Sequence, residues 1–227
     1  MKSSTKSSKV NRAWLNDHVN DTYVKLAKLE GYRARAAYKL KEIDDSFGLI
    51  KPGQLVVDLG STPGAWSQYV RRKMSPKSAT GGGAAVGALN GTIIALDILP
   101  MEPIEGVTFL KGDFQEADVL QRLTDAMQSR LADVVVSDMA PNLSGIASAD
   151  TARIESLVEL ALEFVQSHLK PQGALAVTVF HGPGSDPLVI RFRHTFVVVK
   201  PMQLNASRYK SSANFLLCLR LTALVPP

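Results

Sequence analysis

The sequence VVDLGSTPGAWSQYV, residues 56–70, decides the fold. It begins with an apolar, β-branched run that leads into Asp58, which is typical of a buried strand. A short loop with Gly60 and Gly64 follows, and the next residues have the apolar spacing of a helix. A strand, a tight glycine loop and a helix are the first unit of an α/β sheet, so this stretch predicts that class.

The rest of the chain repeats the alternation of strands and helices. Two helices broken near Gly31 are expected between Asp21 and Phe47. Further strands are predicted at 92–97, 107–114, 173–180, 196–200 and 214–221, a strand and loop at 133–142, and further helices at about 117–131, 151–169 and 186–196. Residues 75–91 are interpreted as a flexible glycine-rich loop. We predict a basic disordered tail at 1–12 and one α/β domain at 13–227 with a mainly parallel sheet.

Positive charge gathers at the start of the chain. Residues 1–41 contain ten Lys and Arg but three Asp and Glu, a net +7, so the other 186 residues carry −2 of the total +5. A basic end on a near-neutral body favours a polyanionic partner. No apolar run is long enough for a membrane span, and the basic start lacks the apolar part of a secretory signal. The one cysteine, Cys218, lies in an apolar run and is expected to be buried, which favours the reducing cytoplasm.

Four aspartates stand at or near the ends of predicted strands: Asp58, Asp97, Asp113 and Asp138. In an open α/β sheet these ends border the ligand crevice. The first loop is not G-x-G-x-x-G, and Pro63 removes an amide donor that a pyrophosphate would use, which argues against NAD or FAD. Asp97 suits ribose hydroxyls and Asp113 suits an adenine amino group. We therefore predict a site for S-adenosylmethionine (SAM) and, with one cysteine, methyl transfer rather than radical chemistry.

The chain resembles the FtsJ-type ribosomal RNA 2′-O-ribose methyltransferases in several segments. From about residue 13 to 220 the order and spacing match in GYRARAAYKLKEID, VVDLGSTPGAWSQYV, IIALDILPMEPIEGVTFLKGDF, SDMAPNLSG, LALEFVQSHLKPQGALAV and ASRYKSS. The resemblance implies a Rossmann-like, SAM-dependent methyltransferase fold with a seven-stranded, mostly parallel sheet whose last strand is antiparallel. It also implies cofactor contacts by Gly64, Trp66, Asp97, Asp113 and Asp138.

The resemblance implies a uridine of large-subunit (23S) ribosomal RNA as the substrate. RNA contacts are expected at basic residues near the N-terminal helices and in a later loop: Arg33, Arg35, Lys39, Arg208 and Lys210. In RARAAYKLK, Arg35 and Lys39 are four residues apart, so we expect them on one helix face within reach of a phosphate backbone. Such contacts would position the RNA without reading its bases.

The chain departs from the family at two of four positions around the reacting ribose. The family is associated with a Lys-Asp-Lys-Glu set, which maps to Lys39, Asp138, Thr178 and Ala213. Threonine has no charge and is a poor base, and alanine has no polar group. We therefore hypothesise that methyl transfer is weakened or lost in this chain.

Other functions stay open at this point. One is a non-catalytic SAM- and RNA-binding module acting in ribosome assembly, which would differ from the enzyme only in turnover. An NAD-dependent oxidoreductase lacks its glycine fingerprint, and the basic N-terminal segment disfavours a small-molecule methyltransferase. The partner we expect is ribosomal RNA of the large subunit, with no membrane, no metal and a monomeric chain.

Overall fold

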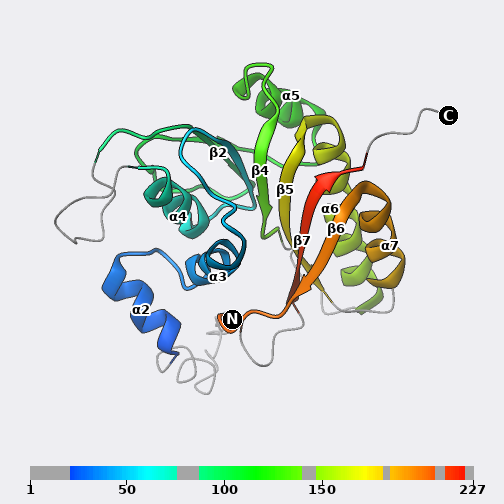
Figure 1. Ribbon diagram of the computed structural model, residues 1–227, viewed down its shortest axis with the longest axis horizontal. Coiled ribbons are helices and arrows are strands. Elements are labelled where there is room, and N and C mark those ends of the chain that lie inside the picture. The colour runs from blue at the N-terminus through cyan, green and yellow to red at the C-terminus, as the bar shows by residue number, and fades with distance from the viewer. Residues whose placement is uncertain (1–20, 76–86, 140–146, 181–184, 208–212, 223–227) are drawn as a thin grey trace, which may run out of the picture.

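The computed structural model describes residues 21–75, 87–139, 147–180, 185–207 and 213–222. Seven strands form one sheet in the order β3-β2-β1-β4-β5-β7-β6 (Figure 1). The strands are β1 (Leu55–Leu59), β2 (Thr92–Asp97), β3 (Val107–Lys111), β4 (Ala132–Ser137), β5 (Leu169–Phe180), β6 (Phe196–Met202) and β7 (Ala213–Leu221). The strand pairs among β1 to β5 are parallel, whereas β7 runs antiparallel to both β5 and β6. This confirms the predicted sheet and its antiparallel last strand.

Helices cover both faces of the sheet. The helices of the described residues are α2 (Thr22–Glu30), α3 (Ala37–Phe47), α4 (Ala65–Lys73), α5 (Ala117–Ala126), α6 (Ala147–His168) and α7 (Ser185–Thr195). Of these, α2 lies apart from the sheet and packs through Ala27 with Tyr38 and Ala206 (Figure 1). One hydrophobic cluster packs α3 and α4 on one face, and a second packs α5, α6 and α7 on the other (Figure 1). All five residues of β1 are buried, with Val56 in the first cluster and Val57 in the second. A central parallel strand covered on both faces is mostly apolar, which explains Leu55, Val56, Val57 and Leu59 and leaves Asp58 as the exception.

The order in which the chain adds strands to the sheet reverses between β1 and β4. From β1 the chain adds β2 and β3 on one side, then returns to add β4 and β5 on the other. Ligands of open α/β sheets bind outside the carboxyl ends of the strands at such a point. The fold therefore places the loops after β1, β2 and β4 together, which is where the predicted cofactor acids stand.

Some boundaries differ from the prediction. Helix α5 ends at Ala126 instead of about Leu131, because Gln128 and Ser129 have positive φ angles of 54° and 57°. Strand β5 begins at Leu169, where the pairing register with β4 shifts, so the predicted helix over 151–169 ends one residue earlier. The predicted tail at 1–12 and most of the loop at 75–91 lie outside the described residues.

Two further features agree with the composition. Cys218 is buried in β7, as predicted, and this burial raises the pKa of its thiol. None of the helices in the described ranges is long and apolar enough to cross a membrane.

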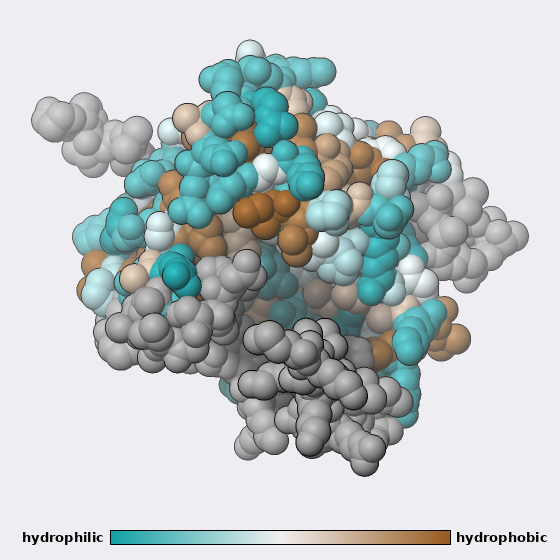
Figure 2. Space-filling model, turned by 180° about the vertical axis from the view of Figure 1, so that it is seen from behind, coloured by the Kyte–Doolittle hydropathy of each residue, from teal (hydrophilic) through white to brown (hydrophobic). Residues whose placement is uncertain are grey.

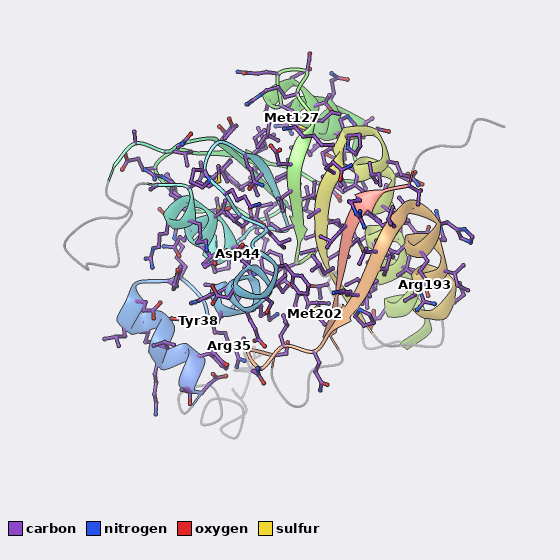
Figure 3. The ribbon with its side chains drawn as sticks, viewed as in Figure 1. Arg35, Tyr38, Asp44, Met127, Arg193 and Met202 are labelled. Carbon is purple, nitrogen blue, oxygen red and sulfur yellow. The ribbon has the colours of Figure 1, made fainter. Side chains whose placement is uncertain are left out.

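A buried carboxylate joins α3 to α4. Asp44, 1% exposed, accepts a hydrogen bond from the Tyr69 hydroxyl at 2.6 Å and pairs with the Lys73 ammonium at 2.9 Å, both from α4 (Figure 3). Its other oxygen accepts the Ile50 amide at 2.8 Å. Burial by itself raises the pKa of Asp44, but these donors outweigh it and hold the pKa below its ordinary value. The ionised carboxylate therefore fixes α3, and with it Lys39, against α4.

Replacing this carboxylate tests how firmly α3 is held. We expect Asp44→Asn to lower the free energy of unfolding at pH 7 by about 2 kcal/mol, because hydrogen bonds to charged groups contribute roughly 1.5–3 kcal/mol. The folded-state pKa is depressed, so the stabilisation is present above the unfolded-state pKa of about 3.9 and is lost as the pH falls through the folded value. Urea unfolding at pH 7 and pH 3 measures this difference.

The control is Asp45→Asn, which removes the neighbouring exposed carboxylate that pairs with Lys41. An exposed pair of this spacing stabilises a helix by about 0.5 kcal/mol at most, so this variant should unfold nearly like the parent chain. If the effect of Asp44→Asn were as large at pH 3 as at pH 7, the charge of Asp44 would not be its cause.

Candidate active site

The carboxyl ends of the strands bring three of the predicted aspartates to one edge of the sheet. Asp58 lies in β1, Asp97 ends β2, and Asp138 follows β4 directly. The charges of Asp138 and Asp97 both act on Asp58, which shows that the three carboxyl groups are close. Seen from behind, the molecule is hollowed near the middle of its face, with hydrophilic atoms inside the hollow (Figure 2).

Asp58 is the most deeply buried of these acids. It is 0% exposed, and one carboxyl oxygen accepts the Ser67 hydroxyl at 2.6 Å. The pKa of Asp58 is raised to about 7, mainly by burial and also by the charges of Asp138 and Asp97, although the bond from Ser67 lowers it. The other oxygen, Oδ1, has no hydrogen-bond partner among the described residues. A buried acceptor without a donor is uncommon and points to a place where chemistry or a ligand supplies one.

Asp97 organises the two loops around it. Its carboxylate accepts the amide of Thr62 at 2.8 Å and that of Leu99 at 2.8 Å, so it joins the loop after β1 to the loop after β2. Directly after it, Ile98 and Leu99 are 58% and 57% exposed. An acid beside exposed apolar side chains suits a nucleoside, with the carboxylate for ribose hydroxyls and the apolar surface for the base. Ile98 and Leu99 were not predicted, although apolar residues straight after a strand-end acid are a usable signal.

Two other predicted cofactor residues have structural contacts. Asp113 accepts the Gln115 amide at 3.0 Å in the turn before α5. Trp66 is 3% exposed, and its indole N–H donates to the Ala36 carbonyl at 2.7 Å. A cofactor contact by either residue stays a prediction.

Gly64 lies under a close cover of protein atoms. It has a φ of 105°, and an added Cβ would lie within 3.0 Å of Ile104, Arg33 and Met101. Glycine is therefore required both by the backbone angle and by the close approach. Its cofactor contact also stays a prediction.

Lys39, Asp138 and Thr178 meet at the same edge. The Lys39 ammonium lies 3.6 Å from one oxygen of Asp138, and the Thr178 hydroxyl donates to the other at 2.6 Å. Lys39 lies in α3, Asp138 directly follows β4, and Thr178 lies near the carboxyl end of β5. Thr178 is 2% exposed, whereas Lys39 and Asp138 keep 19% and 25% of their side chains exposed. The structure thus assembles three of the four positions that the family resemblance singled out.

The aromatic ring of Phe215 lies beside the ammonium group of Lys39. The Lys39 ammonium lies 5.1 Å from the centroid of the Phe215 ring, and Phe215 pairs with Thr178 across β5 and β7. The Trp66 ring packs on Phe215 at 6.3 Å between centroids. A cation over an aromatic face is attracted to it, which favours the observed direction of the lysine. Ala213, the fourth position, is the first residue of β7 and pairs with Phe180.

The predicted RNA contacts have mixed surroundings. Arg35 precedes α3, which begins at Ala37, so the prediction that Arg35 and Lys39 share a helix face is wrong. Arg35 instead forms an ion pair with Asp21 and donates to the Ala206 carbonyl (Figure 3). Arg33 donates to three backbone carbonyls. Arg208 and Lys210 lie outside the described residues.

The arrangement combines a cation, a carboxylate and a hydroxyl beside a site that suits a nucleoside. A cation at such a place can stabilise an oxygen that is losing its proton, and a carboxylate can orient the group that loses it. Both are useful when a hydroxyl oxygen attacks an electrophile.

Comparisons with known proteins agree with this geometry. The chain is 78% identical to the ribosomal RNA large subunit methyltransferase E of Albidiferax ferrireducens, over 97% of this chain and 99% of that protein. It is 67% identical to the protein of the same name from Paracidovorax citrulli, again over 97% and 99%. A Plasmodium falciparum structure described as a ribosomal RNA methyltransferase has the same fold, with a TM-score of 0.69 and 24% identity over 84% of this chain and 98% of that one.

The family model gives the same answer from the pattern of residues. The model described as FtsJ-like methyltransferase matches residues 32–221, which include every element of the structure from α3 to β7. Together with relatives that are similar over nearly their whole length, this match shows that the chain belongs to the FtsJ-like methyltransferase family.

Proposed function

We propose that this protein methylates the 2′-hydroxyl of a uridine in 23S ribosomal RNA of the large subunit, with SAM as the methyl donor. The observation that carries the proposal is the meeting of Lys39, Asp138 and Thr178 beside the strand-end acids. The relatives named as large-subunit ribosomal RNA methyltransferases support the choice of substrate. We also propose that the chain acts as a monomer in the cytoplasm; light scattering would test the first point.

The residues at the edge of the sheet fit SAM. Asp97 would accept hydrogen bonds from the ribose hydroxyls, with Ile98 and Leu99 as apolar surface for the base. The open acceptor of Asp58 suits a cationic part of the ligand, since a nearby positive charge favours an ionised carboxylate. SAM supplies an electrophilic methyl group on a positively charged sulfur.

Lys39 and Asp138 would act on the attacking hydroxyl. The carboxylate oxygens of Asp138 each have lone pairs beyond those facing Lys39 and Thr178, so Asp138 can accept a hydrogen bond from the ribose hydroxyl and orient it. When the hydroxyl oxygen attacks the methyl group, the methyl–sulfur bond would break with its electron pair kept by the sulfur, and Asp138 would take the hydroxyl proton and pass it to water. The Lys39 ammonium stabilises the negative charge that develops on that oxygen. Holding the hydroxyl in line with the methyl group supplies much of the remaining acceleration.

Thr178 stands where the family pattern has a lysine, and its hydroxyl has a defined hydrogen-bond partner. Its hydroxyl donates to Asp138, so it fixes the carboxylate from the side opposite Lys39. The hypothesis that Thr178 and Ala213 weaken methyl transfer gains no support from the family match or from the named relatives. We propose instead that Lys39 and Asp138 carry the reaction and that Thr178 positions Asp138.

Removing the cation tests the proposed reaction. We expect Lys39→Met to lower kcat by about 10²–10³-fold, because the loss of one group that stabilises a developing oxyanion typically costs that much. Transfer of tritiated methyl groups from SAM to undermodified large subunits, at saturating RNA, measures it. The control Lys41→Met removes a lysine of the same helix that pairs with exposed Asp45, and its rate should not change. If the parent chain bound SAM and RNA but showed no turnover, the result would contradict the proposed reaction and support a non-catalytic SAM- and RNA-binding module.

The role of Thr178 makes a second prediction. Thr178→Val keeps the shape of a buried side chain but removes the donor to Asp138, so we expect kcat to fall about ten-fold with the SAM dissociation constant unchanged. The double variant Thr178→Lys, Ala213→Glu should bring no gain under our proposal. A clear rise in its kcat would instead support the hypothesis of weakened catalysis.

A further inference from the structure

The segment between α2 and α3 makes an unexpected contact with the cofactor loops. It contains Arg33, whose basic character led us to expect an RNA contact. Its guanidinium donates to the carbonyls of Pro63 at 3.0 Å, Glu102 at 2.6 Å and Pro103 at 2.9 Å. Its backbone amide also donates to the side chain of Gln68, in α4, at 2.8 Å.

These three carbonyls belong to two different loops. Pro63 is in the loop after β1, whereas Glu102 and Pro103 are in the loop after β2. The same two loops are already joined by Asp97, which accepts the amides of Thr62 and Leu99. Arg33 therefore forms a second link between the two loops. It donates to their backbone carbonyls, whereas Asp97 accepts from their backbone amides. Two loops tied at two points have less freedom than two loops tied at one.

The geometry around Gly64 shows how closely Arg33 fits. A Cβ added at Gly64 would lie 2.9 Å from Nη1 of Arg33, so the absence of a side chain there makes room for the guanidinium. Arginine suits this position because its planar group presents several N–H donors in a fixed fork. Lysine has one nitrogen on a flexible stem and would not span three fixed carbonyls.

These bonds use the face of Arg33 that a phosphate would need. A guanidinium binds phosphate through two parallel N–H donors, and here both terminal nitrogens already donate to carbonyl oxygens. A phosphate bound end-on through both terminal nitrogens would compete with these contacts. The contacts therefore favour a role on the cofactor side over one on the RNA side.

We propose that Arg33 is a positioning residue that holds the two loops of the SAM site in their binding conformation and connects them to the segment before α3. This inference rests on the proposed function for the identity of the ligand. A site that is ordered before its ligand arrives binds more tightly, since less freedom is lost on binding. Arg33 thus raises the affinity for SAM without touching it.

The first test needs no ligand. Hydrogen–deuterium exchange is measured on the full chain for Arg33→Met, Arg33→Lys and the control Arg193→Met, whose exposed side chain lies on α7, away from Arg35 and α3 (Figure 3). We expect faster exchange in residues 98–106 and at Thr62 and Gly64 for Arg33→Met, an intermediate rate for Arg33→Lys and no change for Arg193→Met. Unchanged exchange in both loops for Arg33→Met and Arg33→Lys overturns the inference.

The second test separates the two ligands. Calorimetric titration with SAM should give a dissociation constant about ten-fold higher for Arg33→Met, with partial rescue in Arg33→Lys. Affinity for 23S RNA transcribed in vitro, measured at one fixed salt concentration, should stay within about two-fold. The opposite split, with RNA affinity lost and SAM affinity kept, overturns the inference and assigns Arg33 to RNA phosphate. A parent chain that does not bind SAM overturns the proposed function, while loop exchange still decides whether Arg33 holds the loops.

Discussion

Three carboxyl groups lie at one edge of the sheet, where their negative charges repel one another. The contacts made by the rest of the site offset this repulsion. Asp58, Asp97 and Asp138 are brought together by the order of the parallel strands, which fixes where each strand ends. Each is treated differently: Asp97 accepts backbone amides, Asp138 faces Lys39 and Thr178, and Asp58 is buried with a raised pKa. The edge as a whole therefore favours a positively charged ligand.

The positive charge that lies beside these carboxyl groups comes from a helix and not from a strand of the sheet. Lys39 is carried by α3, and α3 is held by the buried Asp44 through groups on α4. The direction of Lys39 also depends on Phe215, which belongs to the last strand in the chain. Residues at the start, the middle and the end of the sequence thus fix one ammonium group near Asp138.

Much of the fold could be predicted from the sequence because strands and helices leave clear periodic patterns. The strand at 92–97 and the two N-terminal helices appear where the apolar spacing indicates them, and the strand predicted at 107–114 is present but ends at Lys111. The end of α5 could not be predicted, because the left-handed angles of Gln128 and Ser129 are not favoured by those residue types. Helix ends depend on such local angles, which composition does not show.

The candidate site divides along a similar line. The strand-end acids were predictable, because the ends of parallel strands meet at one edge of a sheet whatever their detailed packing. The partners of Arg33 were not, since backbone carbonyls leave no trace in a sequence. Basic residues near an N-terminus suggest nucleic acid by charge alone, and only geometry shows that one of them faces protein loops.

The position of Cys218 has a practical consequence. It is the one cysteine of the chain, and it is fully buried between β5 and β6 in the sheet, with the pKa of its thiol raised by burial. Thiolates, not thiols, react with alkylating reagents, so the folded chain offers such a reagent almost nothing. A cysteine introduced on the surface would be the single labelling site, and a fluorophore or spin label could be attached there without first removing the native residue.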